Sequence, residues 1–347
     1  MAKSIVTCGK YAKIILMFFP EFTVTQKILK NIGAIEYSRA VTDNIKILPA
    51  WEKQLKRDAL VSRVFSLLTS EGVGCEEQDV KENVEGLANS KITEISNVHN
   101  ALNCVKDVGR KNELEEIDLK YINQVLTQKL VPKTKQGAYR TLKKPGKTAP
   151  EEILAKIVIL FDWLNSLDAR ENHPVITASI VEAEILRMEP FEIFNRSTAS
   201  IAFDLVLESC GYGLKGLIEA DSYFINSRKE FEETILEIEK NNFDYTPWLE
   251  FTTHGLAAKT YNLMEKIKLL EKDTKVAKAT GRVKVSERQE RIIEYLQDYG
   301  LLQNKDFPSV FPDISEDTVL RDLKSLLEKG IIKKSGSTKS SRYELSK

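Results

Sequence analysis

The chain has little cysteine, little histidine and no excess of either charge, and each shortage argues against a class of protein. Its 347 residues include four cysteines and three histidines, and no two cysteines form a Cys-x-x-Cys pair. This pattern argues against a disulfide framework and a structural zinc site, and we expect no bound metal. The 51 Lys and Arg balance the 51 Asp and Glu, so no global field draws the chain to nucleic acid or an anionic membrane. A nucleic-acid site would have to be local.

Long apolar runs are also missing. The longest near the start, Ile14 to Phe19, stops at Pro20 and is far shorter than the roughly 20 apolar residues of a membrane span. No small-residue cleavage signature follows it. We interpret it as a buried segment of a cytoplasmic protein without a membrane partner. With 42% hydrophobic and 29% charged residues, the composition is typical of a globular protein of two or three packed units.

Helical periodicity is what the sequence does have. Apolar residues recur at spacings of three and four over 55–69, 117–130 and 151–167, which predicts helices with one buried face each. The stretch 131–150 breaks this pattern with Pro and Gly, and a loop this long inside a helical domain often lies over a site. The predicted fold class is mainly α: all-α through residue 283, apart from at most a small β-hairpin flap, followed by a winged helix.

The pattern changes near the C-terminus. Residues 315–330 predict a well-capped helix, with Ser315 at its N-cap and Gly330 at its C-cap position. Two short β-like segments follow, 331–334 and 341–345, joined by a turn-rich basic tip. This order resembles the winged helix-turn-helix of bacterial regulators, in which the capped helix enters the major groove and the wing contacts phosphate.

A local excess of basic residues supports DNA contact by this unit. Residues 321–347 hold eight Lys or Arg against three Asp or Glu, and such a surface can neutralise phosphates. DNA is therefore the expected partner, although winged helices also serve in dimerisation or protein docking. The candidate DNA-binding residues are Ser315, Thr318, Arg321, Lys324, Ser325, Lys333, Lys334, Lys339 and Arg342.

The middle of the chain resembles the Fic (filamentation) family. The stretch from His173 to Ser200 opens with His-Pro and an apolar helix. Its Glu189-Pro190-Phe191 falls in register with the start of the family signature, His-Pro-Phe-x-x-Gly-Asn-Gly-Arg-x-x-Arg. Further similarities lie at 137–140, 163–165, 244–248 and 286–289. The resemblance covers almost the whole chain and implies a helical fold that usually transfers AMP from ATP to a protein hydroxyl.

The residues that the resemblance would make catalytic are replaced here. The family's general-base histidine is Glu189, and its acidic magnesium ligand is Ile193. Phe194 and Arg196 replace two glycines whose lack of a β-carbon lets backbone N–H groups approach phosphate. Serines replace both phosphate-binding arginines. The degenerate motif positions are Glu189, Pro190, Phe191, Ile193, Phe194, Asn195, Arg196, Ser197 and Ser200.

Two more features concern the same site. The family's inhibitory segment, Ser/Thr-x-x-x-Glu-Gly/Asn, is matched by Glu71-Gly72 but has Leu67 in place of its hydroxyl residue. Since the arginine that this glutamate pairs with in the family is a serine here, we interpret the segment as a switch without its target. Glu182 and Glu189, two helical turns apart, are a candidate carboxylate pair for a metal or a cationic ligand.

Three hypotheses about function follow. The favoured one is a catalytically degenerate Fic domain, with no cofactor expected, joined to a DNA-binding winged helix with a regulatory role. The alternative is a divergent nucleotidyltransferase with a rebuilt site, which would need ATP and Mg²⁺. A further alternative is a protein-interaction scaffold, and each is compatible with a homodimer. The expected domains are 1–105 (N-terminal helical region), 106–264 (Fic-like core), 265–283 (helix and linker) and 284–347 (winged helix-turn-helix).

Overall fold

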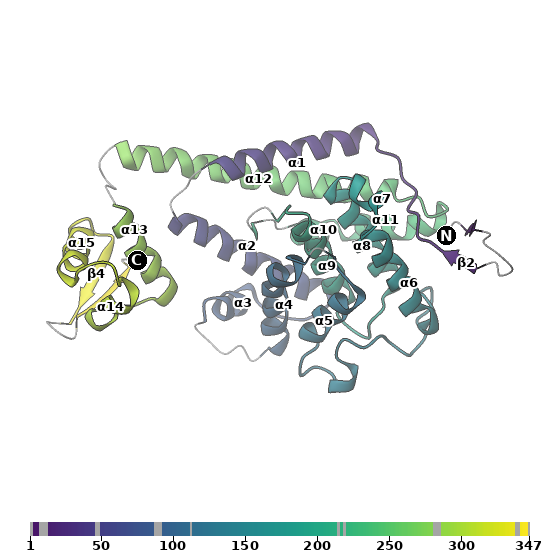
Figure 1. The fold of residues 1–347 in the computed structure, drawn as a ribbon, viewed down its shortest axis with the longest axis horizontal. Coiled ribbons are helices and arrows are strands. Elements are labelled where there is room, and N and C mark those ends of the chain that lie inside the picture. Colours follow the sequence, from purple (N-terminus) through teal and green to yellow (C-terminus); the bar gives the residue numbers. More distant parts are fainter. Residues whose placement is uncertain are drawn as a thin grey trace. The chain divides into compact units, whose positions relative to one another are not determined.

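The segments with helical apolar spacing form helices in the structure (Figure 1). The computed structural model describes residues 3–6, 13–45, 49–86, 92–111, 113–213, 216–217, 220–279, 286–336 and 341–345. The chain divides into two units, one of residues 1–43 and 57–264 and one of residues 44–56 and 265–347. Each unit has a hydrophobic cluster of its own.

The first unit is helical over most of its described length. A typical helix buries one face, as in the helix 93–109, where Ile95, Val98 and Ala101 are inaccessible to solvent. The helices that lie wholly or partly in this unit are α1 (Gln26–Asn44), α2 (Pro49–Ser70), α3 (Glu77–Val84), α4 (Thr93–Gly109), α5 (Glu116–Leu126), α6 (Pro150–Leu164), α7 (Leu167–Glu171), α8 (Pro174–Met188), α9 (Asn195–Ser209), α10 (Asp221–Asn226), α11 (Arg228–Lys240) and α12 (Thr246–Ala279).

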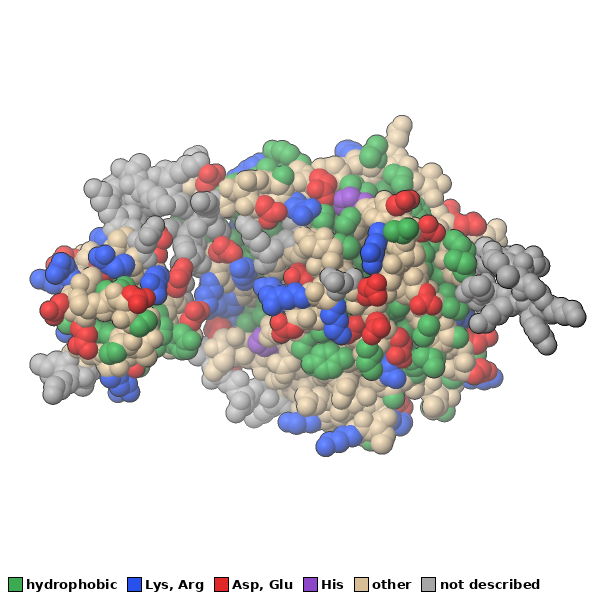
Figure 2. Space-filling view, in the orientation of Figure 1, with side chains coloured by type: hydrophobic (Ala, Val, Ile, Leu, Met, Phe, Trp, Pro, Cys, Tyr) green, Lys and Arg blue, Asp and Glu red, His purple; other side chains and the backbone are tan. Residues whose placement is uncertain are grey.

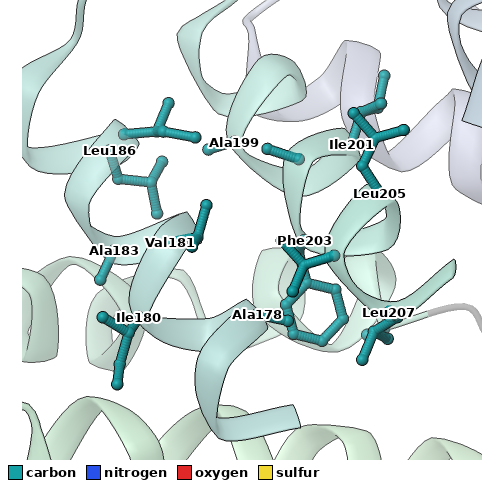
Figure 3. Close-up of a cluster of buried hydrophobic side chains, with 14 of the residues drawn as sticks. Ala178, Ile180, Val181, Ala183, Leu186, Ala199, Ile201, Phe203, Leu205 and Leu207 are labelled. Carbon is teal, nitrogen blue, oxygen red and sulfur yellow. The ribbon is translucent and has the colours of Figure 1, made fainter. Parts of the chain in front are cut away.

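Helices α8 and α9 form the centre of the first unit (Figure 3). Helix α8 packs against α6, α7, α9 and α11, so nearly all of its residues are buried. It begins at Pro174. Proline is tolerated in the first turn of a helix because the N–H that it lacks would have no partner within the helix there. Small side chains such as Ala178 and Ala199 let the two helices approach closely. The loop between α8 and α9 is therefore held at both ends by packed helices.

The expectation of an all-α chain through residue 283 is wrong at the N-terminus. Strands β1 (Lys3–Val6) and β2 (Lys13–Leu16) form an antiparallel hairpin. Both strands are rich in β-branched residues, which favour extended backbone. The run that was expected to be buried is also partly on the surface, since Met17 is 41% and Phe19 is 40% exposed. Phe18, between them, packs edge-on against Trp163 in the core.

Residues 131–149 form a loop and not the small flap hairpin that the sequence also allowed. This described stretch contains one short 3-10 helix, η1 (Lys133–Lys135), and one isolated bridge that pairs Tyr139 with Phe191. Glycine and proline interrupt the stretch before either side could extend into a strand. The bridge attaches this loop to the loop between α8 and α9.

The second unit contains a winged helix. Its sheet has the strand order β3-β5-β4 with antiparallel pairing, and the sequence did not predict the short strand β3. Buried side chains from its α-helices and all three strands meet in one cluster that includes Ile292, Leu323 and Tyr343. The elements are α13 (Glu287–Tyr299), β3 (Leu302–Gln303), η3 (Asn304–Asp306), α14 (Phe307–Val310), α15 (Glu316–Glu328), β4 (Ile332–Ser335) and β5 (Arg342–Leu345).

Charged side chains of both signs cover the surface. Figure 2 shows Lys and Arg interspersed with Asp and Glu on the face in view, as the equal totals of the two kinds suggest. Within the described residues, every helix is too short or too polar to cross a lipid bilayer.

Candidate functional site

The loop between α8 and α9, residues 189–194, carries most of the signature positions. Glu189 has φ +43° and Phe194 has φ +60°, both in the left-handed region that bulky residues rarely adopt. Phe194 is nevertheless buried in the core, so packing of its ring offsets the backbone strain. Phenylalanine therefore makes a turn for which the family signature uses glycine. Ile193, in the same loop, packs against the core with a half-buried side chain.

Asn195 closes this loop onto its own backbone. The Asn195 Oδ1 accepts a hydrogen bond from the Phe191 N–H, and the Asn195 Nδ2 donates one to the Phe191 carbonyl, both at 2.9 Å. The Asn195 side chain is buried. Since both its oxygen and its nitrogen bond the backbone of Phe191, Asn195 shapes the loop.

Arg140 ties the 131–149 loop to the signature loop. Its backbone N–H donates to the Pro190 carbonyl at 2.9 Å, and its buried guanidinium donates to four more carbonyls. Those acceptors are Leu142 (2.9 Å), Thr148 (2.5 Å), Met188 (3.2 Å) and Glu189 (2.8 Å). A buried arginine needs such acceptors because it carries five N–H donors. The 131–149 loop is therefore fixed against the signature positions.

Glu189, in the position of the family's histidine, is paired with two lysines of that loop. Its carboxylate lies 3.0 Å from the Lys144 Nζ and 2.9 Å from the Lys147 Nζ. Burial alone would raise the pKa of Glu189, but the two ammonium groups outweigh it and hold this pKa below its usual value. The half-buried carboxylate is thus ionised and its charge is balanced within the chain.

Arg196, in a glycine position of the signature, extends away from the turn. Its guanidinium lies 2.9 Å from a carboxylate oxygen of Glu232 and over the ring of Phe231, 5.5 Å from the ring centre. Both partners lie on α11. Arg196 also lines a cleft of about 630 Å³ that the signature loop, the 131–149 loop and α11 enclose.

Glu71 occupies the positive end of α9. The Ser197 N–H, in the first turn of α9, donates to the Glu71 Oε1 at 2.7 Å. Burial raises the pKa of Glu71, while the Ser197 hydrogen bond and the charge of Arg196 oppose that rise. A carboxylate in this place satisfies a helix-terminal N–H and interacts favourably with the helix dipole. Glu71 belongs to the segment that we interpreted as a switch without its target. In the structure its hydrogen-bond partner is the backbone N–H of Ser197.

Ser200, in place of the second signature arginine, belongs to a buried charge cluster. Its hydroxyl donates to Asp221 at 2.5 Å, and Arg63 binds both Asp221 (2.7 Å) and Asp204 (2.5 Å). Burial raises the pKa of Asp204 to about 6, although Arg63 lowers it in part. Burial, with the charges of Asp221 and Asp204, also raises the pKa of Glu182 well above its usual value. The Glu182 Oε2 has no hydrogen-bond partner.

The two members of the candidate carboxylate pair lie in separate surroundings in the structure. Glu189 ends α8 in a left-handed conformation and meets the lysines of the loop, whereas Glu182 lies in the middle of α8 near the acidic cluster. Among the described residues, no group of three or more His, Cys, Asp or Glu could hold a metal ion. Sequence reasoning missed Arg63, Asp204 and Asp221, because their charges meet only through long-range packing.

In the second unit, α15 presents part of the predicted DNA-binding surface. Arg321 and Lys324 are exposed and neither forms an ion pair with another described residue, while Thr318 and Ser325 are half-buried. Ser315 is the N-cap residue, as the sequence predicts. Its hydroxyl bonds the Thr318 hydroxyl at 2.8 Å and no backbone N–H. Helix α15 therefore exposes two cations, Arg321 and Lys324, and three acids, Glu316, Asp317 and Glu328.

The wing carries the remaining predicted residues. Lys334 and Arg342 are exposed on β4 and β5. Lys333 is exposed too, but its ammonium lies 3.1 Å from the Glu344 carboxylate in the neighbouring strand. Lys339 lies outside the described residues. The basic face of the wing thus rests on Lys334 and Arg342.

A buried acid fixes α15 in place. Asp322 accepts hydrogen bonds from the Arg288 Nε (2.9 Å) and the Gln289 Nε2 (3.3 Å), both on α13. Gln289 is itself part of the capping box in which Ser286 starts α13. Asp322 thus anchors α15 to α13, while the neighbouring Arg321 faces solvent.

Comparison with known domains identifies the second unit. Residues 288–338 match the model of the DeoR-like helix-turn-helix domain. No curated protein matches the chain significantly in sequence.

Comparison with solved structures identifies the fold of the first unit. A Fic family protein from Desulfovibrio desulfuricans aligns with a TM-score of 0.62 at 17% identity, over 94% of this chain and 98% of that one. Fic-1 from C. elegans aligns with a TM-score of 0.59 at 15% identity, over 70% and 73% of the two chains. A Fic domain-containing signaling protein from Bacteroides thetaiotaomicron aligns with a TM-score of 0.51 at 19% identity, over 71% and 98%. At these identities the likeness establishes the fold, which is the Fic fold that the sequence predicts.

Proposed function

We propose that this chain is a DNA-binding regulator whose Fic-like unit does not transfer nucleotides. The observation that carries DNA binding is a set of exposed cations on the second unit. Helix α15 exposes Arg321 and Lys324, and the wing exposes Lys334 and Arg342. A protein gains affinity for DNA by placing such groups against phosphates and releasing counterions. In a chain without net charge, this local surface supports a dedicated site.

The geometry suits entry of α15 into the major groove. In helix-turn-helix proteins the second helix reads base edges with residues near its N-terminus, while flanking elements contact the backbone. Ser315 and Thr318 lie at that end of α15, and Arg321 lies one turn further along. Arginine there can bind guanine with two hydrogen bonds. We assign base contact to this end of α15 and phosphate contact to the wing.

Fluorescence anisotropy of a labelled duplex of random sequence tests DNA binding by the full chain. We expect the logarithm of the binding constant to fall linearly as the logarithm of the salt concentration rises. Selection from a pool of random duplexes should then enrich one sequence class. Absence of binding at low salt, or binding insensitive to salt, would contradict the proposal. If the chain acts as a homodimer, as we also propose, the enriched sites should contain two inverted half-sites.

The residues of the cleft do not fit a magnesium nucleotide. Ile193 offers no oxygen to a cation, although Mg²⁺ requires oxygen ligands. Phe194 places a side chain in the turn that would have to approach phosphate. Glu71 already accepts the Ser197 N–H at the end of α9, where a phosphate would be bound by a helix N-terminus. A phosphate there would also meet the negative charge of this carboxylate.

Calorimetric titration of the chain with ATP and Mg²⁺ tests this second half of the proposal. We expect no saturable heat, whereas a protein with the complete Fic signature should bind under the same conditions. Saturable binding would favour the divergent nucleotidyltransferase. Incubation with labelled ATP would then show whether AMP is transferred to a protein hydroxyl. DNA binding and nucleotide binding are measured separately, so one half of the proposal can fail without the other.

A further inference from the structure

A second cavity lies beside the cleft, and Ser200 is part of its wall. Serine fills far less space than the arginine that the family signature has at this position. The cavity has a volume of about 50 Å³, which is room for roughly three to five water molecules. Glu182 and Asp221 are the acidic side chains that line it. The apolar side chains that line it are Leu67, Leu186, Phe224, Ile225 and Phe231.

The polar part of this cavity has too few positive charges. The buried carboxyl groups of Glu182 and Asp221, and that of the partly buried Asp204 beside the cavity, share the single guanidinium of Arg63. Asp221 also accepts a hydrogen bond from Ser200, but the Glu182 Oε2 has no partner although only 3% of that residue is exposed. Buried carboxyl oxygens normally have hydrogen-bond partners. Glu182 lines the cavity, so a donor placed in the cavity could satisfy this carboxyl group.

The mouth of the cavity has the opposite charge. Arg196 and Arg228 both line it, and both pair with the one carboxylate of Glu232, at 2.9 and 3.0 Å. Two guanidinium groups and one carboxylate leave net positive charge there. A molecule with a cationic head and an anionic tail would match both ends of the cavity.

We propose that this cavity binds a small guanidinium compound, with its head against Glu182 and Asp221 and an anionic tail toward Arg196 and Arg228. A guanidinium head has four heavy atoms, a size that suits the space deep in the cavity. Its planar set of N–H donors suits carboxylate oxygens. Its delocalised charge is more weakly hydrated than that of an ammonium, so it enters a partly apolar site more readily. The proposal requires neither DNA binding nor an inactive nucleotide site.

Binding should release a proton. Burial and the neighbouring charges of Asp221 and Asp204 outweigh the charge of Arg63 and keep the pKa of Glu182 well above its usual value. A bound cation favours the ionised carboxylate and lowers that pKa. Affinity should therefore rise with pH, and titrations in two buffers of different ionisation enthalpy should reveal the released proton.

Calorimetry of the full chain with L-arginine and L-citrulline tests the proposal. L-citrulline has a neutral urea group in the place of the guanidinium of L-arginine. We expect L-arginine to bind about tenfold or more tightly than L-citrulline, since hydrogen bonds to charged groups are worth about 1.5–3 kcal/mol. Agmatine, which lacks the carboxylate, should bind more weakly than L-arginine. Absence of saturable heat from both L-arginine and methylguanidinium would overturn the proposal.

Three variants place the ligand in this cavity. Glu182→Gln removes the charge with little change of shape and should abolish the preference for L-arginine over L-citrulline. Glu237→Gln, on the exposed face of α11, is the matched control and should bind like the parent chain. Ser200→Arg fills the cavity with a guanidinium from the chain itself and should prevent binding. If either Glu182→Gln or Ser200→Arg, folded by circular dichroism, binds L-arginine as the parent does, the assignment is wrong.

Discussion

At the scale of single residues, Phe194 shows two opposing effects at one position. Its left-handed backbone costs on the order of 1–2 kcal/mol relative to glycine. Its buried ring contributes more, since loss of a core phenylalanine typically costs about 3–5 kcal/mol. Phe194→Gly should therefore lower the free energy of unfolding by about 1–4 kcal/mol, measured by urea denaturation. The turn is stabilised by the side chain and not by the backbone.

Phe243 provides the matched control for that substitution. It has φ +65° but is 43% exposed, so glycine there relieves strain at a smaller cost in burial. We expect Phe243→Gly to change the unfolding free energy by less than Phe194→Gly does, within about 1 kcal/mol of the parent. A stabilising Phe194→Gly substitution would mean that strain dominates at both positions.

Glu182 makes stability depend on pH. Its pKa is raised in the folded chain by burial and by two neighbouring carboxylates, so the folded state holds a proton that the unfolded state releases at lower pH. The stabilising effect of that proton is complete below the unfolded pKa of roughly 4.3 and is lost as pH rises toward the folded pKa. Asp204, with a pKa of about 6, acts in the same direction from roughly pH 4 to 6.

Glu182→Gln should remove the contribution of Glu182 to this loss. We expect the melting temperature of the variant, relative to the parent, to be higher at about pH 8 than at about pH 5. Scanning calorimetry without added guanidinium compounds measures the difference. The Glu237→Gln variant should show a constant offset over the same range. An offset that is also constant for Glu182→Gln would mean that Glu182 titrates normally in the folded chain.

At the scale of elements, local patterns predicted helices and failed where partners are distant. The spacing of apolar residues predicted the helix over 151–167, and the structure has α6 and α7 there. The capping residues likewise predicted α15, because N-cap and C-cap preferences act within a few residues. The contact of Glu71 with Ser197 joins residues 126 positions apart, so no local pattern reveals it.

The candidate site divides in the same way. The residues at the signature positions could be compared with the family signature from sequence alone. The same comparison shows that position 193 is an isoleucine and not an acid. The lysine partners of Glu189 could not be predicted from sequence, because they depend on how Arg140 fixes the 131–149 loop. The first strand of the wing sheet, β3, has two residues, which is too short for a periodic pattern.

Helix α15 and the wing should contribute to DNA affinity through charge. Arg321→Ala together with Lys324→Ala removes two exposed cations, which should reduce the salt slope of binding by about 2 if both contact phosphate. If Arg321 contacts a base instead, preference for the enriched site should fall and the slope should change by about 1. Fluorescence anisotropy over a range of salt concentrations distinguishes the two.

Lys229→Ala together with Lys240→Ala is the control for that pair. Both lysines are exposed on α11 of the first unit, so the variant has the same change of net charge on another element. We expect its DNA affinity and salt slope to match those of the parent. An equal loss in both double variants would assign DNA binding to general charge and not to the winged helix.

At the scale of the whole molecule, the two hydrophobic clusters share no residues. Each contains a central side chain that is fully buried, Ile180 in α8 and Leu323 in α15. Since the hydrophobic effect acts through burial within each cluster, damage to one should leave the other intact. The chain should therefore unfold in two steps, and calorimetry should resolve two transitions.

Truncation of one central side chain at a time tests this independence. Leu323→Ala should destabilise the winged helix by about 2–5 kcal/mol, lower only its transition and weaken DNA binding near that transition. Ile180→Ala should lower only the transition of the helical unit, because its cavity forms where α8 packs against its neighbours. DNA added to the parent chain should raise the winged-helix transition alone, since a ligand stabilises the part that binds it. If all three perturbations shift both transitions together, the two clusters unfold cooperatively, and the helices that run from one unit into the other, α2 and α12, must couple them.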